Sequence, residues 1–104
     1  MTTIKELQEQ TKELAETFPQ TTVEQRLLFL VTEVGEVTRE VLHLSGAYTS
    51  HGAADPAAAK ERLGMERYDV FWNCCDLANR LDIDLEEAFG KKIAQNRARQ
   101  WRRP

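Results

Sequence analysis

Apolar residues recur at intervals of three and four along most of the chain, which is the period of an amphipathic helix. No stretch alternates apolar and polar residues over the length that a strand needs. The pattern therefore predicts an all-α fold, a four-helix bundle. The first helix is expected over residues 3–16. Its inner side is expected to consist of Ile4, Leu7, Thr11 and Leu14.

Pro19 breaks this first helix, and a second helix is expected to begin just after it. Two overlapping capping boxes, one starting at Thr21 and one at Thr22, indicate a helix start in this segment. The second helix is expected to run to about Leu44. Its apolar stripe consists of Leu27, Leu30, Val31, Val34, Val37, Val41 and Leu44.

A loop of small residues with two glycines covers residues 45–54 and is expected to be mobile. Asp55 as N-cap and Pro56 as first helical residue predict the start of a third helix. The inward side of this helix is expected to carry Leu63, Val70, Cys74, Leu77 and Leu81. Asp84 opens another capping box, which predicts a fourth helix that reaches about Trp101.

The composition fits one soluble globular domain over residues 1–104. With 41% hydrophobic and 30% charged residues, the chain has enough apolar side chains to argue against disorder. No apolar run approaches the roughly 20 residues that span a bilayer. The polar N-terminus lacks the apolar core of a signal peptide. A cytoplasmic protein without a membrane partner is expected, and the wide apolar stripes predict self-association.

The net charge of −3 conceals an asymmetry between the middle of the chain and its end. From residue 91 onward there is no acid, and the basic residues are Lys91, Lys92, Arg97, Arg99, Arg102 and Arg103. A basic tail can bind nucleic acid, but no recognisable element for reading bases accompanies it. A small phosphate-bearing ligand suits it equally, and Lys92, Asn96 and Arg97 are candidates for contacts with phosphates.

Acidic residues follow a regular spacing on the second and third expected helices. Glu33, Glu36 and Glu40 recur at intervals of three and four, which places their carboxylates on one side of a helix beside its apolar stripe. Glu66 and Asp69 repeat the arrangement on the third helix. Like charges at such spacings repel each other and lower helix stability.

Two helices that each carry a carboxylate pair beside the buried seam can oppose those pairs across a groove. Four close carboxylates repel strongly unless a cation joins them, and Mg²⁺ prefers carboxylate, water and phosphate oxygens. The sequence therefore predicts an Mg²⁺ site, with Mn²⁺ as a substitute, made by Glu33, Glu36, Glu66 and Asp69. Asn73 and Asp76 extend the third-helix row. The alternative is a solvated acidic face, which is the usual role of such pairs.

The chain carries EVGEV at 33–37, ERYDV at 66–70, LANRLDIDLEEAF at 77–89 and KKIAQNRARQW at 91–101. These motifs resemble the MazG-like, all-α NTP pyrophosphohydrolases, whose relatives include dCTP pyrophosphatases, dimeric dUTPases and phosphoribosyl-ATP pyrophosphohydrolase. The resemblance covers about residues 25–101. Its hallmark is Glu-x-x-Glu on one helix and Glu-x-x-Asp on the next.

The resemblance implies that Mg²⁺ is held by the four acids and that a nucleoside triphosphate is hydrolysed between its α and β phosphates. The products would be a monophosphate and pyrophosphate, and the role would be clearance of unwanted nucleotides. Lys92 and Asn96 match the lysine and asparagine that lie near the substrate in this family, with Arg97 and Arg99 as weaker candidates. The resemblance also implies a homodimer or homotetramer with the site at or near a subunit interface.

Several positions depart from the family pattern and leave the base preference open. Arg67 and Tyr68 stand between the third-helix acids, where relatives typically carry small or apolar residues. Asn73, a candidate substrate-binding residue, replaces an aromatic of dCTP-directed relatives, and Phe18 is the nearest aromatic to their N-terminal tryptophan region. A dUTP or phosphoribosyl-ATP substrate is one alternative. A non-catalytic helical interaction module is another, although the four intact acids argue against it.

Overall fold

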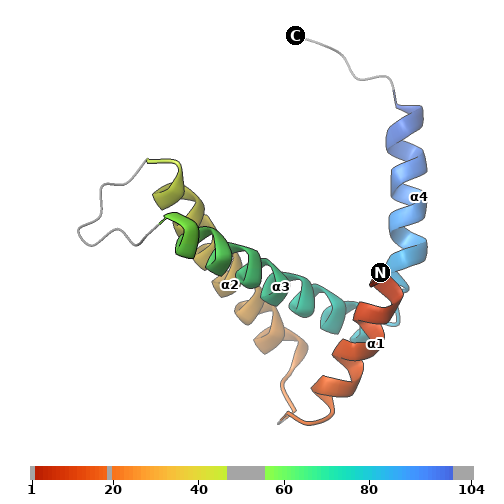
Figure 1. Ribbon diagram of the computed structural model, residues 1–104. Helices are drawn as coiled ribbons and strands as arrows, with labels where there is room; N and C mark the ends of the chain where they lie inside the picture. The colour runs from red at the N-terminus through yellow and green to blue at the C-terminus, as the bar shows by residue number, and fades with distance from the viewer. Residues whose placement is uncertain (1, 19, 47–55, 100–104) are drawn as a thin grey trace.

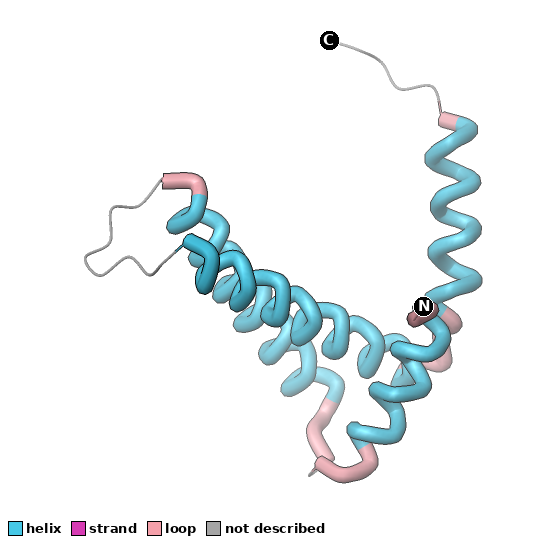
Figure 2. Tube along the Cα trace, viewed as in Figure 1, coloured by secondary structure: helices cyan, strands magenta, loops and turns pink. Residues whose placement is uncertain are grey.

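The structure is a computed structural model, and it describes residues 2–18, 20–46 and 56–99. Within these ranges the chain forms four helices and no strand, which confirms the all-α prediction (Figure 1). The helices are α1 (Ile4–Ala15), α2 (Val23–Leu44), α3 (Pro56–Arg80) and α4 (Leu85–Ala98). A short turn connects α3 to α4 (Figure 2). None of these helices is long and apolar enough to cross a membrane.

Helix α3 organises the fold. It runs antiparallel beside α2, and α1 packs across its C-terminal half (Figure 1). Helix α4 leaves the turn after α3, touches mainly α1, and then points away from the other helices. The radius of gyration is 17.0 Å, whereas a compact domain of this length has about 13 Å. A single chain therefore does not close into a compact bundle.

Local capping signals set the starts of two helices. The hydroxyl of Thr22 accepts a hydrogen bond from the Gln25 amide at 3.1 Å, and the Gln25 side chain accepts one from the Thr22 amide at 2.8 Å. The predicted box at Thr22 is thus confirmed, whereas Thr21 turns to two arginines instead. Asp84 caps α4, as predicted, by accepting from the Glu87 amide at 3.1 Å. Each cap satisfies a helix-end amide that has no partner within the helix.

The connection from α3 to α4 depends on Gln8 of α1, which is buried. Its amide nitrogen donates to the Ile83 carbonyl at 2.9 Å, and its amide oxygen accepts from the Leu85 amide at 2.9 Å. Asp82 adopts a left-handed backbone with φ of 57°, which lets the Ile83 amide reach the Ala78 carbonyl at 2.8 Å. These bonds fix where α4 begins.

Two predicted helix boundaries and one predicted loop lie at the edges of the residue ranges that the structure describes. Helix α4 ends at Ala98 because Arg99 has an extended backbone, and the expected end at Trp101 lies outside the described residues. Pro56 is the first residue of α3, as predicted. Its expected cap at Asp55 lies outside the described residues, as does most of the loop expected over 45–54.

The inward side predicted for α3 is wrong at two positions. Cys74 is exposed, and its neighbour Cys75 is the most deeply buried side chain among the described residues. Leu81, which follows the helix, is also exposed. The buried face of α3 is turned because polar Asn73 and Asp76 belong to it, which a purely apolar stripe does not anticipate. The buried residues of α3 are Ala59, Trp72, Asn73, Cys75, Asp76 and Ala78.

The apolar stripe predicted for α2 exists, but none of its members is fully buried. Val31 is 69% exposed, and Leu27, Val34 and Val41 are also exposed. On α1, Leu14 is exposed too, contrary to its predicted inner position. The chain exposes 8457 Å², roughly 40% more than a compact monomer of its mass. Much of the predicted seam is therefore open in one chain.

Candidate functional site

The acidic residues of α2 and α3 come within electrostatic range of one another. We call this group the acid cluster, and its members are Glu33, Glu36, Glu40, Glu66 and Asp69. The structure thus places the four predicted metal ligands and Glu40 within electrostatic range of one another. The spacing of three and four residues on each helix, and the antiparallel pairing of the two helices, account for their meeting.

Two members of the acid cluster hold their protons more tightly than usual. Partial burial raises the pKa of Glu33 first, and the carboxylates of Glu36 and Asp69 raise it further. Partial burial also raises the pKa of Glu66, followed by the charges of Glu40 and Glu36. Both effects disfavour the ionised form, because a desolvated charge next to like charges is costly.

Glu66 also has an unsatisfied atom. Its Oε2 is shielded from solvent and accepts no hydrogen bond. A nearby cation, Arg62, lowers the pKa of Glu66 in part, and lies 3.8 Å from the Glu40 carboxylate. A buried carboxylate oxygen without a partner is unfavourable unless something else coordinates it.

The carboxylates interact electrostatically, but they are not arranged to bind one metal ion together. In the described ranges, no group of three or more His, Cys, Asp or Glu side chains is arranged to hold a metal ion as it stands. Electrostatic repulsion acts over several ångströms, whereas an Mg²⁺–oxygen bond is about 2.1 Å long. The donor set consists of oxygens from two helices, which is the type of ligand that a hard divalent cation prefers.

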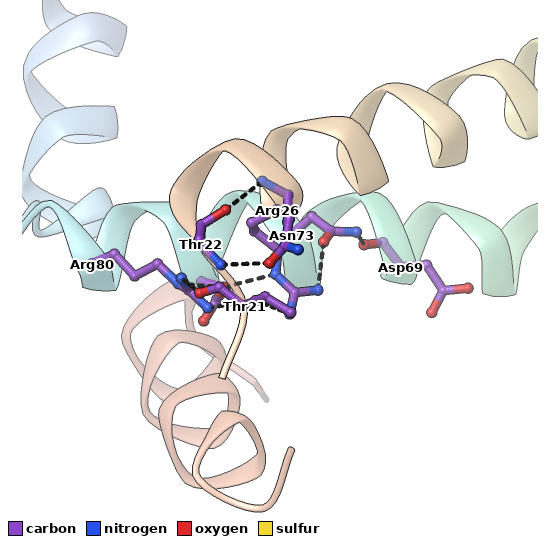
Figure 3. Close-up of polar contacts among 8 residues, drawn as sticks. Thr21, Thr22, Arg26, Asp69, Asn73 and Arg80 are labelled. Carbon is purple, nitrogen blue, oxygen red and sulfur yellow. Dashed lines mark hydrogen bonds and ion pairs between the residues drawn. The ribbon is translucent and has the colours of Figure 1, made fainter. Parts of the chain in front are cut away.

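A second charged group, which sequence reasoning missed, lies further along the same helix pair. We call it the arginine network, and it consists of Thr21, Arg26, Asn73 and Arg80, which Figure 3 labels, together with Asp76. The Nε atoms of Arg26 and Arg80 lie 3.0 and 2.9 Å from the same oxygen of Asp76, which is buried. Arg80 Nη1 donates to the Thr21 carbonyl, and its Nη2 donates to the Thr21 hydroxyl at 2.9 Å.

The arginine network changes the interpretation of two residues. Asp76 does not extend the acidic row, because it pairs with two guanidinium groups. The buried Asn73 accepts from Arg26 Nη1 at 3.2 Å and donates to the Asp69 carbonyl at 2.9 Å. Figure 3 shows the Asp69 carboxylate pointing away from this network. The network therefore holds α2 to α3 beside the acid cluster.

A pocket of about 410 Å³ adjoins the acid cluster at Glu33 and Asp69. We call it the aromatic pocket, because its lining includes Phe18, Phe29, Tyr68 and Trp72. Phe18 meets Trp72 edge to face at 5.8 Å, and the Arg26 guanidinium lies 4.8 Å from the Trp72 ring centroid. Its volume lies within the range of small-molecule sites. The four rings come from three separate segments, so no motif within one segment predicts this pocket.

The predicted phosphate-binding residues on α4 lie elsewhere in a single chain. Helix α4, which carries Lys92, Asn96 and Arg97, points away from the α2–α3 pair (Figure 1). Lys92 donates to Gln95 of its own helix at 3.3 Å. The Asn96 Oδ1 atom is shielded and accepts no hydrogen bond. One chain alone does not bring these residues to its acid cluster.

Comparison with known proteins gives limited information. No protein-family model matches the chain, and no solved structure matches it. The uncharacterized protein YpjD of Bacillus subtilis (strain 168) is 39% identical over 62 residues. This similarity covers 60% of the chain and 52% of YpjD, so the chain spans about half the length of that relative. Its name states no activity, and the function has to be argued from the site.

Proposed function

We propose that this protein is a MazG-like nucleoside triphosphate pyrophosphohydrolase that depends on Mg²⁺. It cleaves the bond between the α and β phosphates and releases a monophosphate and pyrophosphate. The observation that carries the proposal is the acid cluster, in which partial burial and the charges of neighbouring carboxylates on two helices raise the pKa values of Glu33 and Glu66. The orphaned Glu66 Oε2 adds to it, because a cation would satisfy that atom.

The roles of the acids follow from their positions. Glu33, Glu36, Glu66 and Asp69 would hold Mg²⁺ or, in its place, Mn²⁺. When bound, the cation neutralises phosphate oxygens and lowers the pKa of a bound water. A carboxylate of the acid cluster accepts the proton of the attacking water. Glu40 is suited to this role because it lies outside the four ligands and beside Glu66.

We further propose that the working form is a homodimer or homotetramer. The surface excess of the single chain, about 2,500 Å², is of the size that obligate interfaces remove. Exposed apolar side chains lie on α2 and also on α4, where Phe89 is 38% exposed and Ile93 is 51% exposed. Association along these faces would let Lys92, Asn96 and Arg97 approach the acid cluster of another copy. A cytoplasmic location agrees with a nucleotide substrate.

Turnover of a panel of canonical, deoxy and damaged nucleoside triphosphates with Mg²⁺ tests the proposal, with products resolved by chromatography. Monophosphate and pyrophosphate are expected, and Glu36→Gln should reduce the rate by roughly 10²–10⁴-fold. Glu24→Gln, an exposed acid in the first turn of α2, serves as the matched control and should keep the rate. Diphosphate and phosphate as products would overturn the assignment of the cleaved bond.

The exposed apolar faces also favour a second candidate, a non-catalytic helical interaction module. This module would show no turnover with any member of the panel. It would still self-associate or bind another protein through α2 and α4. Loss of association on Ile93→Lys, without any nucleotide chemistry in the parent protein, would favour it over the enzyme.

A further inference from the structure

We propose that Arg62 binds the outer phosphates of the substrate, which leave as pyrophosphate, and that Glu40 positions Arg62 for this role. The identity of the substrate rests on the proposed function, to which Arg62 adds a phosphate-binding residue. Arg62 lies on α3 one turn before Glu66. Its side chain is therefore on the side of the helix that carries the acid cluster.

Two observations place the charge of Arg62 at one end of the acid cluster. Its Nη2 atom lies 3.8 Å from Oε2 of Glu40, which belongs to the neighbouring helix α2. Its charge also lowers the pKa of Glu66, whereas the charges of nearby carboxylates raise it. A positive charge in this position attracts anions to the end of the cluster where Glu40 and Glu66 lie.

The guanidinium group of Arg62 keeps its hydrogen-bond donors available. A separation of 3.8 Å is too long for a hydrogen bond, so the attraction to Glu40 is one of charge. The side chain of Arg62 is 47% exposed, whereas that of Glu40 is 19% exposed. A planar guanidinium with available N–H groups binds two phosphate oxygens at once, which an ammonium group does not.

The arginines of the arginine network are already engaged in holding the fold. Arg26 donates to the Thr21 hydroxyl, and Arg80 donates to the same hydroxyl and to the Thr21 carbonyl. Both arginines also meet the carboxylate of Asp76. A phosphate would have to break these contacts. Arg62, by contrast, is held near the acids by charge and can turn to a phosphate at little cost.

The charge of the acid cluster shows why a further cation is needed beside Mg²⁺. One Mg²⁺ neutralises the charge of two of the five carboxylates, and a triphosphate brings further negative charge. The aromatic pocket adjoins the opposite end of the cluster, at Glu33 and Asp69, and has room for the part of a nucleotide that carries no phosphate. The outer phosphates of that nucleotide would then lie toward Arg62.

The test measures binding by calorimetry and needs no turnover. Inorganic pyrophosphate is titrated into the protein at a fixed Mg²⁺ concentration, and Mg²⁺ alone is titrated in a second series. Arg62→Gln should weaken pyrophosphate binding by roughly 10–100-fold, because it removes hydrogen bonds between charged groups. The same variant should bind Mg²⁺ alone about two- to tenfold more tightly, because it removes a positive charge beside the metal ligands.

Two further variants separate charge from geometry and from position. Arg62→Lys keeps the charge, so it should bind Mg²⁺ as the wild type does but should still weaken pyrophosphate binding severalfold. Arg67→Gln is the matched control, because it removes the same charge from an exposed position on another side of α3. It should leave both affinities within about twofold of the wild type.

Several outcomes would overturn the role of Arg62. These are an equal loss of pyrophosphate affinity in Arg67→Gln, no loss in Arg62→Gln, or no binding of pyrophosphate to the wild type. Weaker binding of both Mg²⁺ and pyrophosphate in Arg62→Gln would also overturn it, because a structural role explains that result. Pyrophosphate binding that depends on Arg62, in a protein that turns over no nucleotide, would keep the phosphate-binding role and remove the proposed function.

Discussion

The arginine network and the acid cluster both involve α2 and α3, but the carboxylate of the first is paired with cations, whereas the carboxylates of the second lie mainly near other carboxylates. In the network, one buried carboxylate, Asp76, meets two guanidinium groups at about 3 Å. In the acid cluster, five carboxylates lie within electrostatic range of one another, and Arg62 lies 3.8 Å from the carboxylate of Glu40. The first arrangement holds helices together. The second weakens the fold by itself, which is typical of residues retained for a ligand.

The contrast also shows why equal spacing does not mean equal function. Glu66, Asp69, Asn73 and Asp76 follow one another at intervals of three and four on α3. Only the last two meet Arg26, because α2 reaches that part of α3 with its first turn. The partner helix, and not the row itself, decides which of these side chains are buried and paired.

The largest expected effect concerns the paired side of this comparison. Asp76→Ala leaves the guanidinium groups of Arg26 and Arg80 without their shared carboxylate in a buried position. We expect a loss of about 3–5 kcal/mol in the free energy of unfolding, measured by urea denaturation. A loss below about 1 kcal/mol would mean that the arginine network does not hold α2 to α3.

The neutral side chain of Gln8 shows how much buried hydrogen bonds contribute to stability when no charge is involved. Gln8→Ala leaves the Ile83 carbonyl and the Leu85 amide without their partner. We expect a loss of about 1–3 kcal/mol and faster hydrogen exchange at the start of α4. Gln10→Ala, an exposed glutamine on the same helix, should change stability by less than about 0.5 kcal/mol. Equal effects of the two variants would contradict the role of Gln8.

The acid cluster should respond in the opposite direction. Without divalent cations, Glu66→Gln removes a repelled charge, and we expect the Tm to rise by about 2–4 °C at neutral pH. Differential scanning calorimetry in the presence of a chelator measures it. A fall in Tm would show that the Glu66 charge is stabilising and that the acid cluster is already compensated.

The pH dependence of this difference has a defined sign. The folded state raises the pKa of Glu66 above its ordinary value of 4.5, so the folded protein binds this proton more tightly than the unfolded chain. Stability therefore falls as the pH rises from 4.5 through the raised pKa. The advantage of Glu66→Gln should be absent below pH 4.5 and appear as the pH rises, in parallel melting curves. An advantage that is largest in acid would contradict the repulsion.

The smallest effect is expected for a charge pair that belongs to neither group. Lys91 and Glu87 lie 3.1 Å apart on α4, but their side chains are 78% and 63% exposed. Lys91→Ala should change the free energy of unfolding by less than about 0.5 kcal/mol. A larger loss would indicate that another copy of the chain covers this part of α4.

Local signals made the helices predictable from the sequence. The caps at Thr22 and Asp84 depend on residues three positions apart, and both were confirmed. The sequence pattern could not predict which side of α3 is buried, because the burial of Asn73 depends on Arg26, which lies 47 residues earlier. The direction of α4 likewise depends on Gln8, 77 residues before Leu85. The spacing of apolar residues along a helix does not predict contacts between residues that lie far apart in the sequence.

In the candidate site, too, the local features could be predicted from the sequence and the contacts between distant segments could not. The acid cluster could be predicted because each half is a short motif on one helix, and pairing the two helices was enough to join them. The aromatic pocket could not, since Phe18, Phe29 and Tyr68 come from three segments. The contact between α4 and the acids stays a prediction, because a single chain holds them apart.

The central claim is that the acid cluster is kept for a divalent cation, and the response of Tm to Mg²⁺ tests it most directly. Mg²⁺ should raise the Tm of the wild-type protein with increasing concentration and should raise that of Glu24→Gln equally. Glu36→Gln and Glu66→Gln should lose most of this response. The same Mg²⁺-dependent shift in all four proteins, or no shift in any of them, would contradict the account.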